Sequence, residues 1–278
     1  MDREADIGAF QEGTSLSFIN ETYWIAWREL KRYLRSRIGM ISRLLQPVVW
    51  LGFVGNIFSD TRPLLQSVGF PSGYLDYMTP GAIAMVVLFT GIFGGMTTLW
   101  DRRFGYFQKI LATPVSRYAI ALGKVLAISV IAGIQAFCIL GIAFLLGVQI
   151  GTGVLGVVGI IIVAMILGCG FAAVSIIIGT KAATQEAFWG IINFMGLPLL
   201  FMSSALFPLT LMPNWLASLA KYNPLTYAID AIRFFVTPSF RVASGVGLQI
   251  DILTVLAFAL VAVIASAYVF TREVQRSI

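Results

Sequence analysis

Charged and aromatic side chains gather in one polar stretch that apolar sequence flanks on both sides, 101–124, DRRFGYFQKILATPVSRYAIALGK. Its cations outnumber its acids, because Asp101 is the only carboxylate in it. Cations beside exposed aromatic rings suit the docking of another protein rather than bond-making chemistry. The alternative is an aromatic belt at the membrane interface. We predict a docking loop over 101–117. Its expected contact residues are Arg102, Phe104, Tyr106, Phe107 and Lys109.

Side chains for covalent or metal chemistry are largely missing from the chain. It contains no His, no phosphate-binding loop of the form G-x-x-x-x-G-K-[ST], and no nucleophile beside a base. Cys138 and Cys169 stand alone in apolar runs, which is typical of small packed residues. We therefore expect no enzyme, no metal site and no cofactor on this chain.

The composition indicates a polytopic membrane protein. The 278 residues are 58% hydrophobic and 12% charged, with a mean hydropathy of +0.88, whereas soluble domains carry about 25% charged residues. The net charge of +6 comes from Lys and Arg clustered in a few loops, so we expect no nucleic-acid partner. The N-terminal residues 1–19 are polar and are expected to form a cytoplasmic tail, and without an apolar signal region we expect no cleaved signal peptide.

Uncharged runs place six predicted transmembrane helices in a single domain, 20–278. A run of about 20 residues rising 1.5 Å each crosses a hydrocarbon core of about 30 Å. The predicted spans are 38–58, 77–100, 118–146, 154–180, 187–206 and 252–271. Of the nineteen Lys and Arg residues, fifteen fall on the side of the two termini. This bias places both termini in the cytoplasm, with the spans in the plasma membrane.

A basic amphipathic helix is predicted before the first span. Tyr23, Trp27, Leu30 and Leu34 recur every three or four residues, and basic side chains fall mostly on the other side. This pattern favours a helix lying in the membrane interface, in contact with lipid. The alternative is a soluble helix packed on a partner.

The segment 207–235 is apolar enough for membrane depth, yet several prolines break it. Irregular backbone is tolerated at that depth only where protein or a water-filled cavity surrounds it. We therefore expect re-entrant helices that form an outer gate, with a surface loop as the alternative. Asp230 and Arg233 are spaced to pair on one helix, either at partial depth or as an exposed pair of little energy. The candidate gate residues are Pro208, Pro213, Trp215, Pro224, Asp230 and Arg233.

Six spans enclose too little space for a large amphiphile, so a path between two copies of the chain is expected. Aromatic rings with a few amides and hydroxyls suit a mostly apolar site, although ordinary helix packing explains any one of them equally well. The candidate path residues are Phe53, Asn56, Phe89, Phe93, Thr97, Asn193, Phe194 and Phe201. The spans are almost free of ionisable groups, which argues against a proton-driven carrier.

The whole chain resembles the membrane subunits, or permeases, of ABC-2 class ATP-binding-cassette exporters, and most of all the drug-exporter and nodulation-factor-exporter branch. Two motifs carry the resemblance, DRRFGYFQKILATPVSRYAIALGK at 101–124 and ALFPLTLMPNWLASLAKYNPLTYAIDAIR at 205–233. The family often has the motif D-R-E-x-G at the position of residues 101–105. This chain has Arg103 in place of the glutamate, so no charge pairing is carried over at position 103.

The resemblance implies a homodimer of the permease working with two separate ATPase subunits. ATP and Mg would be bound by those partners, and the loop after the second span would form the coupling helix against them. The N-terminal helix would lie at the interface, and re-entrant helices would precede the sixth span on the outside. The expected function is outward transport of a hydrophobic or amphipathic substrate, such as a drug, a lipid or a lipid-linked glycan. The alternatives are a secondary transporter or channel and a non-transporting membrane scaffold.

Overall fold

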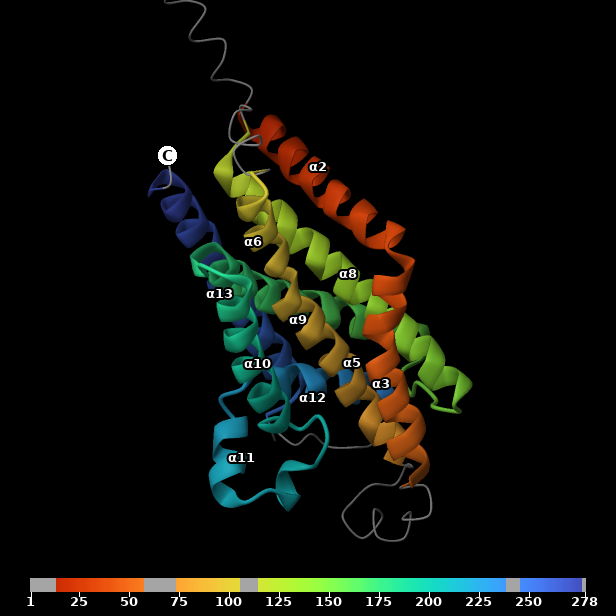
Figure 1. Cartoon of the computed structure of the whole chain (residues 1–278). Coiled ribbons are helices and arrows are strands. Elements are labelled where there is room, and N and C mark those ends of the chain that lie inside the picture. Colours follow the sequence, from red (N-terminus) through yellow and green to blue (C-terminus); the bar gives the residue numbers. More distant parts are fainter. Residues whose placement is uncertain (1–13, 58–73, 106–114, 239–245, 277–278) are drawn as a thin grey trace, which may run out of the picture.

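The computed structural model describes residues 14–57, 74–105, 115–238 and 246–276, and all regular structure within these ranges is helical. Most of the helices run along a single elongated bundle (Figure 1). The helices are α2 (Thr14–Arg35), α3 (Arg37–Ile57), α5 (Tyr74–Gly94), α6 (Met96–Arg103), α8 (Arg117–Leu145), α9 (Gly153–Lys181), α10 (Gln185–Phe201), the 3-10 turn η2 (Leu209–Leu211), α11 (Asn214–Ala220), α12 (Pro224–Val236) and α13 (Leu248–Arg276).

Four helical segments in the described part of the chain are long and apolar enough to cross a membrane: Tyr74–Arg103, Arg117–Leu145, Gly153–Lys181 and Leu248–Val274. The all-helical class predicted from the sequence is confirmed, with four membrane-capable segments where six were expected. The expected first span lies in α3, whose shorter apolar part is Leu44–Phe53. The expected fifth span, 187–206, follows α10 as far as Phe201, and α10 has 17 residues.

Helix α5 forms the centre of the bundle, and most of its side chains are buried. It packs against α9 and α8, and α9 also contacts α13. Small residues allow these close contacts. A Cβ added at Gly95 would lie 2.0 Å from the Ser175 carbonyl oxygen, and one added at Gly179 would lie 2.3 Å from the Gly95 carbonyl oxygen. Gly95 therefore sets how closely the α5–α6 segment approaches α9.

The N-terminal helix α2 lies along α8 (Figure 1) and begins at Thr14, within the stretch expected to be tail. Its apolar residues Tyr23, Trp27 and Leu34 are exposed, whereas Glu29 and Tyr33 are buried against the bundle. A helix that turns apolar rings outward and a carboxylate inward is suited to lipid surroundings, because lipid solvates the rings and protein cations pair with the acid.

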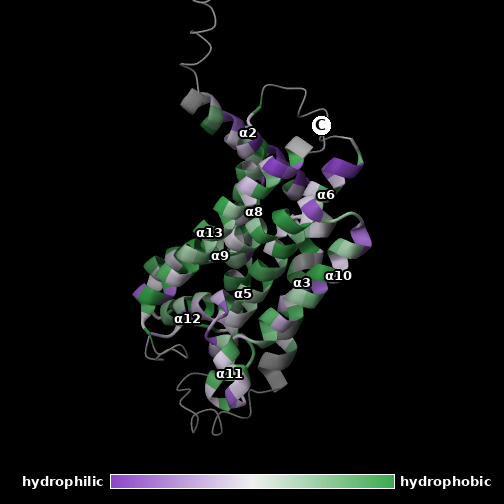
Figure 2. Cartoon of the chain, turned by 90° about the vertical axis from the view of Figure 1, so that its left-hand side faces the viewer, coloured by the Kyte–Doolittle hydropathy of each residue, from purple (hydrophilic) through white to green (hydrophobic). Residues whose placement is uncertain are grey.

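The two ends of the bundle differ in polarity. Helices α2 and α6 and the end of α13 lie together at one end, where hydrophilic side chains are frequent (Figure 2). Helices α11 and α12 lie at the opposite end. Helix α12 is packed inside the bundle against α13, α9 and α5. Its buried face includes Leu225, Ile229 and Ile232.

Candidate functional site

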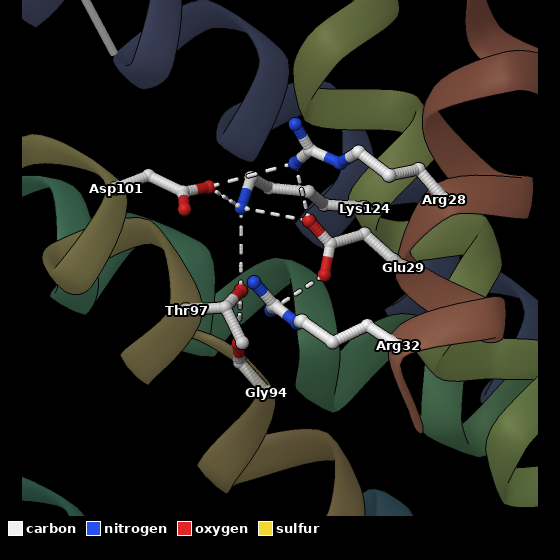
Figure 3. A network of polar contacts seen from close by, with 7 residues as sticks. All are labelled: Arg28, Glu29, Arg32, Gly94, Thr97, Asp101 and Lys124. Carbon is white, nitrogen blue, oxygen red and sulfur yellow. Dashed lines mark hydrogen bonds and ion pairs between the residues drawn. The ribbon is translucent and has the colours of Figure 1, made fainter. Parts of the chain in front are cut away.

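A buried lysine is the centre of the polar network at the hydrophilic end of the bundle. Lys124 is 1% exposed, and its Nζ lies 2.5 Å from Asp101 Oδ2 and 3.5 Å from Glu29 Oε1. It also donates a hydrogen bond of 3.3 Å to Thr97 Oγ1. Figure 3 shows these side chains converging from α2, the α5–α6 segment and α8. A buried ammonium group needs such partners, because burying an unpaired charge costs several kcal/mol.

Glu29 joins the same network from α2. Its carboxylate lies 2.6 Å from Nη2 of Arg28 and 2.6 Å from Nη2 of Arg32, and Arg28 also lies 3.7 Å from Asp101 (Figure 3). Burial alone would raise the pKa of Glu29, but the Lys124, Arg32 and Arg28 cations outweigh it and hold the pKa below its ordinary value of 4.5. The carboxylate therefore stays ionised inside the protein.

Close helix contacts bring these partners together. The Gly95 amide donates to Ser175 Oγ at 2.9 Å, and Arg102 donates to the Thr180 carbonyl, so both contacts tie the α5–α6 segment to α9. On the other side, a Cβ added at Gly123 would lie 2.7 Å from Ile25 Cβ. Gly123 directly precedes Lys124, so the lack of a side chain there lets α2 come close to α8 beside the buried lysine.

No motif in the sequence marks these residues as a common site. In the sequence, Asp101 and Lys124 mark only the two ends of the polar stretch 101–124, and Glu29 lies among the basic residues of the helix predicted before the first span. A usable signal was present, because Glu29 is an acid within a strongly basic helix and Lys124 follows the start of an apolar helix. Both positions need an opposite charge, but the sequence does not say which one.

The predicted docking residues are described only at the start of the loop. Arg102 belongs to α6, and Phe104 follows it with 75% of its side chain exposed. Tyr106, Phe107 and Lys109 lie outside the described residues, so their docking role stays a prediction.

The predicted path residues fall into separate groups. Phe89 and Phe93 stack at 5.5 Å between ring centroids, and Phe93 also contacts Trp189 of α10 at 5.2 Å. Thr97 instead lies on the side of Lys124. Asn56 belongs to α3. The remaining members are exposed on the surfaces of α3 and α10: Phe53, Asn193, Phe194 and Phe201.

The predicted gate residues divide between a buried pair and an exposed edge. Arg233 Nη1 lies 2.9 Å from Asp230 Oδ1, as the spacing predicts, and both side chains are buried. Arg233 also donates to the Ser204 carbonyl at 2.9 Å and lies 4.2 Å from the centroid of the Tyr77 ring. Ser204 in turn donates to Asp230 at 3.3 Å.

The other gate residues lie around this pair. Pro224 is the first residue of α12, and Pro208 and Pro213 directly precede η2 and α11. Trp215 is exposed on α11. The structure thus places a fixed polar cluster at this end of the bundle, and the gating role stays a prediction.

Known proteins resemble the chain over most of its length. The family profile "ABC-2 type transporter" matches residues 20–237. "Putative transport permease ycf38" of Cyanophora paradoxa is 31% identical over 81% of this chain and 77% of its own. "Probable doxorubicin resistance ABC transporter permease protein DrrC" of Mycobacterium tuberculosis (strain CDC 1551 / Oshkosh) is 25% identical over 78% and 77%. "Inner membrane transport permease YadH" of Escherichia coli (strain K12) is 23% identical over 76% and 83%.

The matched region includes α2 from Asn20 onward with its carboxylate Glu29, the α5–α6 segment, the buried Lys124 of α8 and all of α12. With four membrane-capable helical segments and relatives that are named permeases, the chain belongs to the ABC-2 type transporter family and is a transport permease of that family.

Proposed function

We propose that this chain is the membrane subunit of an ABC exporter, which moves a hydrophobic or amphipathic molecule outward with ATP hydrolysed by a separate subunit. One observation carries the proposal: the ABC-2 profile matches 20–237, while the sequence contains no phosphate-binding loop of its own. ATP and Mg are then bound by the partner. A drug, a lipid and a lipid-linked glycan all suit the apolar surroundings, and one relative is named for doxorubicin resistance.

The proposed topology has six spans, with α3 as the first and α10 as the fifth. Helices α11 and α12 form the re-entrant segment at the outer end, and both termini face the cytoplasm at the plasma membrane. Two observations support this orientation. The start of α2 and the last residues of α13 lie at the same end of the bundle (Figure 1), and most Lys and Arg residues fall on that side in the sequence.

The coupling role is tested by removing the aromatic rings of the loop. Tyr106→Ala combined with Phe107→Ala is expected to abolish co-purification of the ATPase subunit, because buried aromatic anchors carry much of an interface's binding energy. Phe137→Ala is a matched control, since Phe137 is an exposed aromatic of α8 far along the chain from the loop. Equal recovery of the ATPase with both variants would rule out docking through these two rings.

The proposed homodimer uses the exposed apolar faces of α3 and α10. In a background without the native Cys138 and Cys169, Phe194→Cys is expected to give a disulfide-linked dimer in native membranes. Leu260→Cys is the control, because Leu260 is also an exposed apolar residue but belongs to α13. Monomeric bands from Phe194→Cys, or equal dimer from both positions, would contradict this interface.

The proposed outer gate is tested by labelling. Leu211→Cys and Leu216→Cys are expected to resist a membrane-impermeant thiol reagent added outside, because both positions would lie within the outer leaflet. Ser239→Cys is expected to react, as an outer loop position. Rapid labelling at all three positions would identify an ordinary outer loop and remove the gate.

A further inference from the structure

A cavity of about 330 Å³ lies beside the Lys124 network, and among the candidate path residues only Thr97 lines it. Five helical elements enclose it, because α2, α3, α5, α6 and α8 all contribute lining residues. Its volume falls at the lower end of the range for small-ligand sites, about 300–1,000 Å³. Phe89 and Phe93 do not line it, so it is separate from the aromatic group that faces α10.

The cavity is apolar with a few placed polar groups, which is the usual character of a ligand site. Ile128 and Ile131 of α8 and Trp100 of α6 supply apolar walls. Thr90 donates to the Gln135 side-chain oxygen, and the Gln135 amide donates to Tyr33 Oη at 2.7 Å. These hydrogen bonds fix the Tyr33 and Thr90 side chains in the wall, so the site is formed before a ligand arrives.

The electrostatics of the cavity favour an anion. Three cations, Arg28, Arg32 and Lys124, face the two carboxylates of Glu29 and Asp101, which leaves an excess of positive charge (Figure 3). Arg32 lines the cavity with 49% of its side chain exposed, and its contact with Glu29 uses one terminal nitrogen. A guanidinium group has five N–H donors, so Arg32 retains donors for a second anion.

The start of α3 adds to this preference. Helix α3 begins at Arg37, and Ser36 and Gly39 on either side of that point line the cavity. The amides of a first helical turn carry partial positive charge and bind phosphate and carboxylate groups. Trp100 also lines the cavity and its ring is partly exposed. Exposed tryptophan rings are typical of residues at a membrane interface.

We propose that this cavity binds the phosphate-bearing headgroup of an anionic lipid from the cytoplasmic leaflet. The phosphate lies at Arg32, Ser36 and the first turn of α3. The first carbons of the acyl chains, next to the glycerol, lie against Trp100, Ile128 and Ile131. Basic pockets between membrane helices on the cytoplasmic side are suited to such headgroups. The assignment to that leaflet rests on the proposed orientation, whereas binding itself depends on neither orientation nor ATPase coupling.

The test is lipid binding by the purified full-length chain in maltoside detergent, measured by native mass spectrometry. Short-chain phosphatidylglycerol is expected to bind at least tenfold more tightly than phosphatidylcholine of the same chain length. Arg32→Gln is expected to weaken phosphatidylglycerol binding about tenfold, since it removes a charge-assisted hydrogen bond. Ser36→Phe, which places a ring at an exposed lining position, is expected to have a similar effect.

Lys31→Gln is the matched control, because it removes the same charge from an exposed position of α2 that does not line the cavity. Equal loss of binding in Arg32→Gln and Lys31→Gln would overturn the site and leave only general attraction to a basic helix. Equal binding of phosphatidylglycerol and phosphatidylcholine would overturn the anion preference. Competition by inorganic phosphate at the concentration of the lipid would overturn the lipid assignment, because the acyl chains would then contribute nothing.

Discussion

Two buried ion-pair sites among the described residues lie at opposite ends of the bundle and are built in different ways. Asp230 and Arg233 belong to one helix, α12, and face each other across a single turn. The Lys124 network instead joins α2, α6 and α8, and its members have more than one partner, since Asp101 contacts both Lys124 and Arg28. Under the proposed orientation we call Asp230–Arg233 the outer pair and the Lys124 network the inner network. The outer pair moves with its helix as one unit, whereas the inner network changes whenever two of its helices move apart.

Because they are built differently, the two sites are suited to different physical roles: one anchors a helix, and the other responds to movement between helices. The outer pair anchors α12 to the segment after α10 through the Ser204 carbonyl and to α5 through the Tyr77 ring. The inner network links the start of the predicted docking loop to the N-terminal helix and to the third predicted span. It is therefore suited to report a displacement of the loop, because alternative partners lie within a few ångströms of one another.

The largest effect is expected from breaking the outer pair. Asp230→Ala leaves the Arg233 charge buried at 1% exposure, which costs about 3–5 kcal/mol of unfolding free energy. The measurement is thermal unfolding of the purified chain in detergent. The double variant Asp230→Ala with Arg233→Met is expected to recover much of the loss, because no charge remains buried. A double variant as unstable as the single one would show that packing, not charge pairing, holds α12.

Breaking the inner network is expected to cost less. Lys124→Met leaves Asp101 and Glu29 without their buried cation, but Arg28 and Arg32 still face them and are partly in water, so the expected loss is about 2 kcal/mol. Adding Asp101→Asn to Lys124→Met is expected to restore stability in the same thermal measurement. A loss above that of Asp230→Ala would reverse the ranking of the two sites.

A third variant tests whether helix spacing holds the inner network. Gly95→Ala forces the α5–α6 segment away from α9, and overpacking of this kind costs about 1–3 kcal/mol. Gly141→Ala is the control, because a Cβ at Gly141 meets nothing within 4 Å. Indistinguishable melting temperatures for the two variants would mean that the crossing adjusts without cost.

The smallest effect is a change in pH dependence at the inner network. The pKa of Glu29 is lowered by folding, so its ion pairs stabilise the protein at pH values above the ordinary glutamate pKa of 4.5. That contribution is lost as the pH falls below 4.5 and through the lower pKa of the folded state. Glu29→Gln is therefore expected to unfold with a flatter pH profile than the wild type over that range. Parallel profiles would contradict the linkage.

The sequence determined those features that depend only on neighbouring residues, namely the helices and the Asp230–Arg233 contact. Long uncharged runs predicted helices, because a backbone in lipid must satisfy its hydrogen bonds within the segment. The Asp230–Arg233 contact was also predictable, since residues three apart on one helix are neighbours whatever surrounds them. The burial of that pair was not, because it depends on α12 lying inside the bundle against α5, α9 and α13.

Tertiary structure alone decided the inner network and its cavity. Glu29 meets Lys124 only because α2 lies against α8, where Gly123 allows close approach. Thr97 shares the predicted span 77–100 with Phe89 and Phe93, yet it lies on the side of Lys124. Which face of a helix meets which neighbour is set by packing across the whole bundle. A sequence gives the charge and periodicity of each helix, and the distances between helices fix which charges become partners.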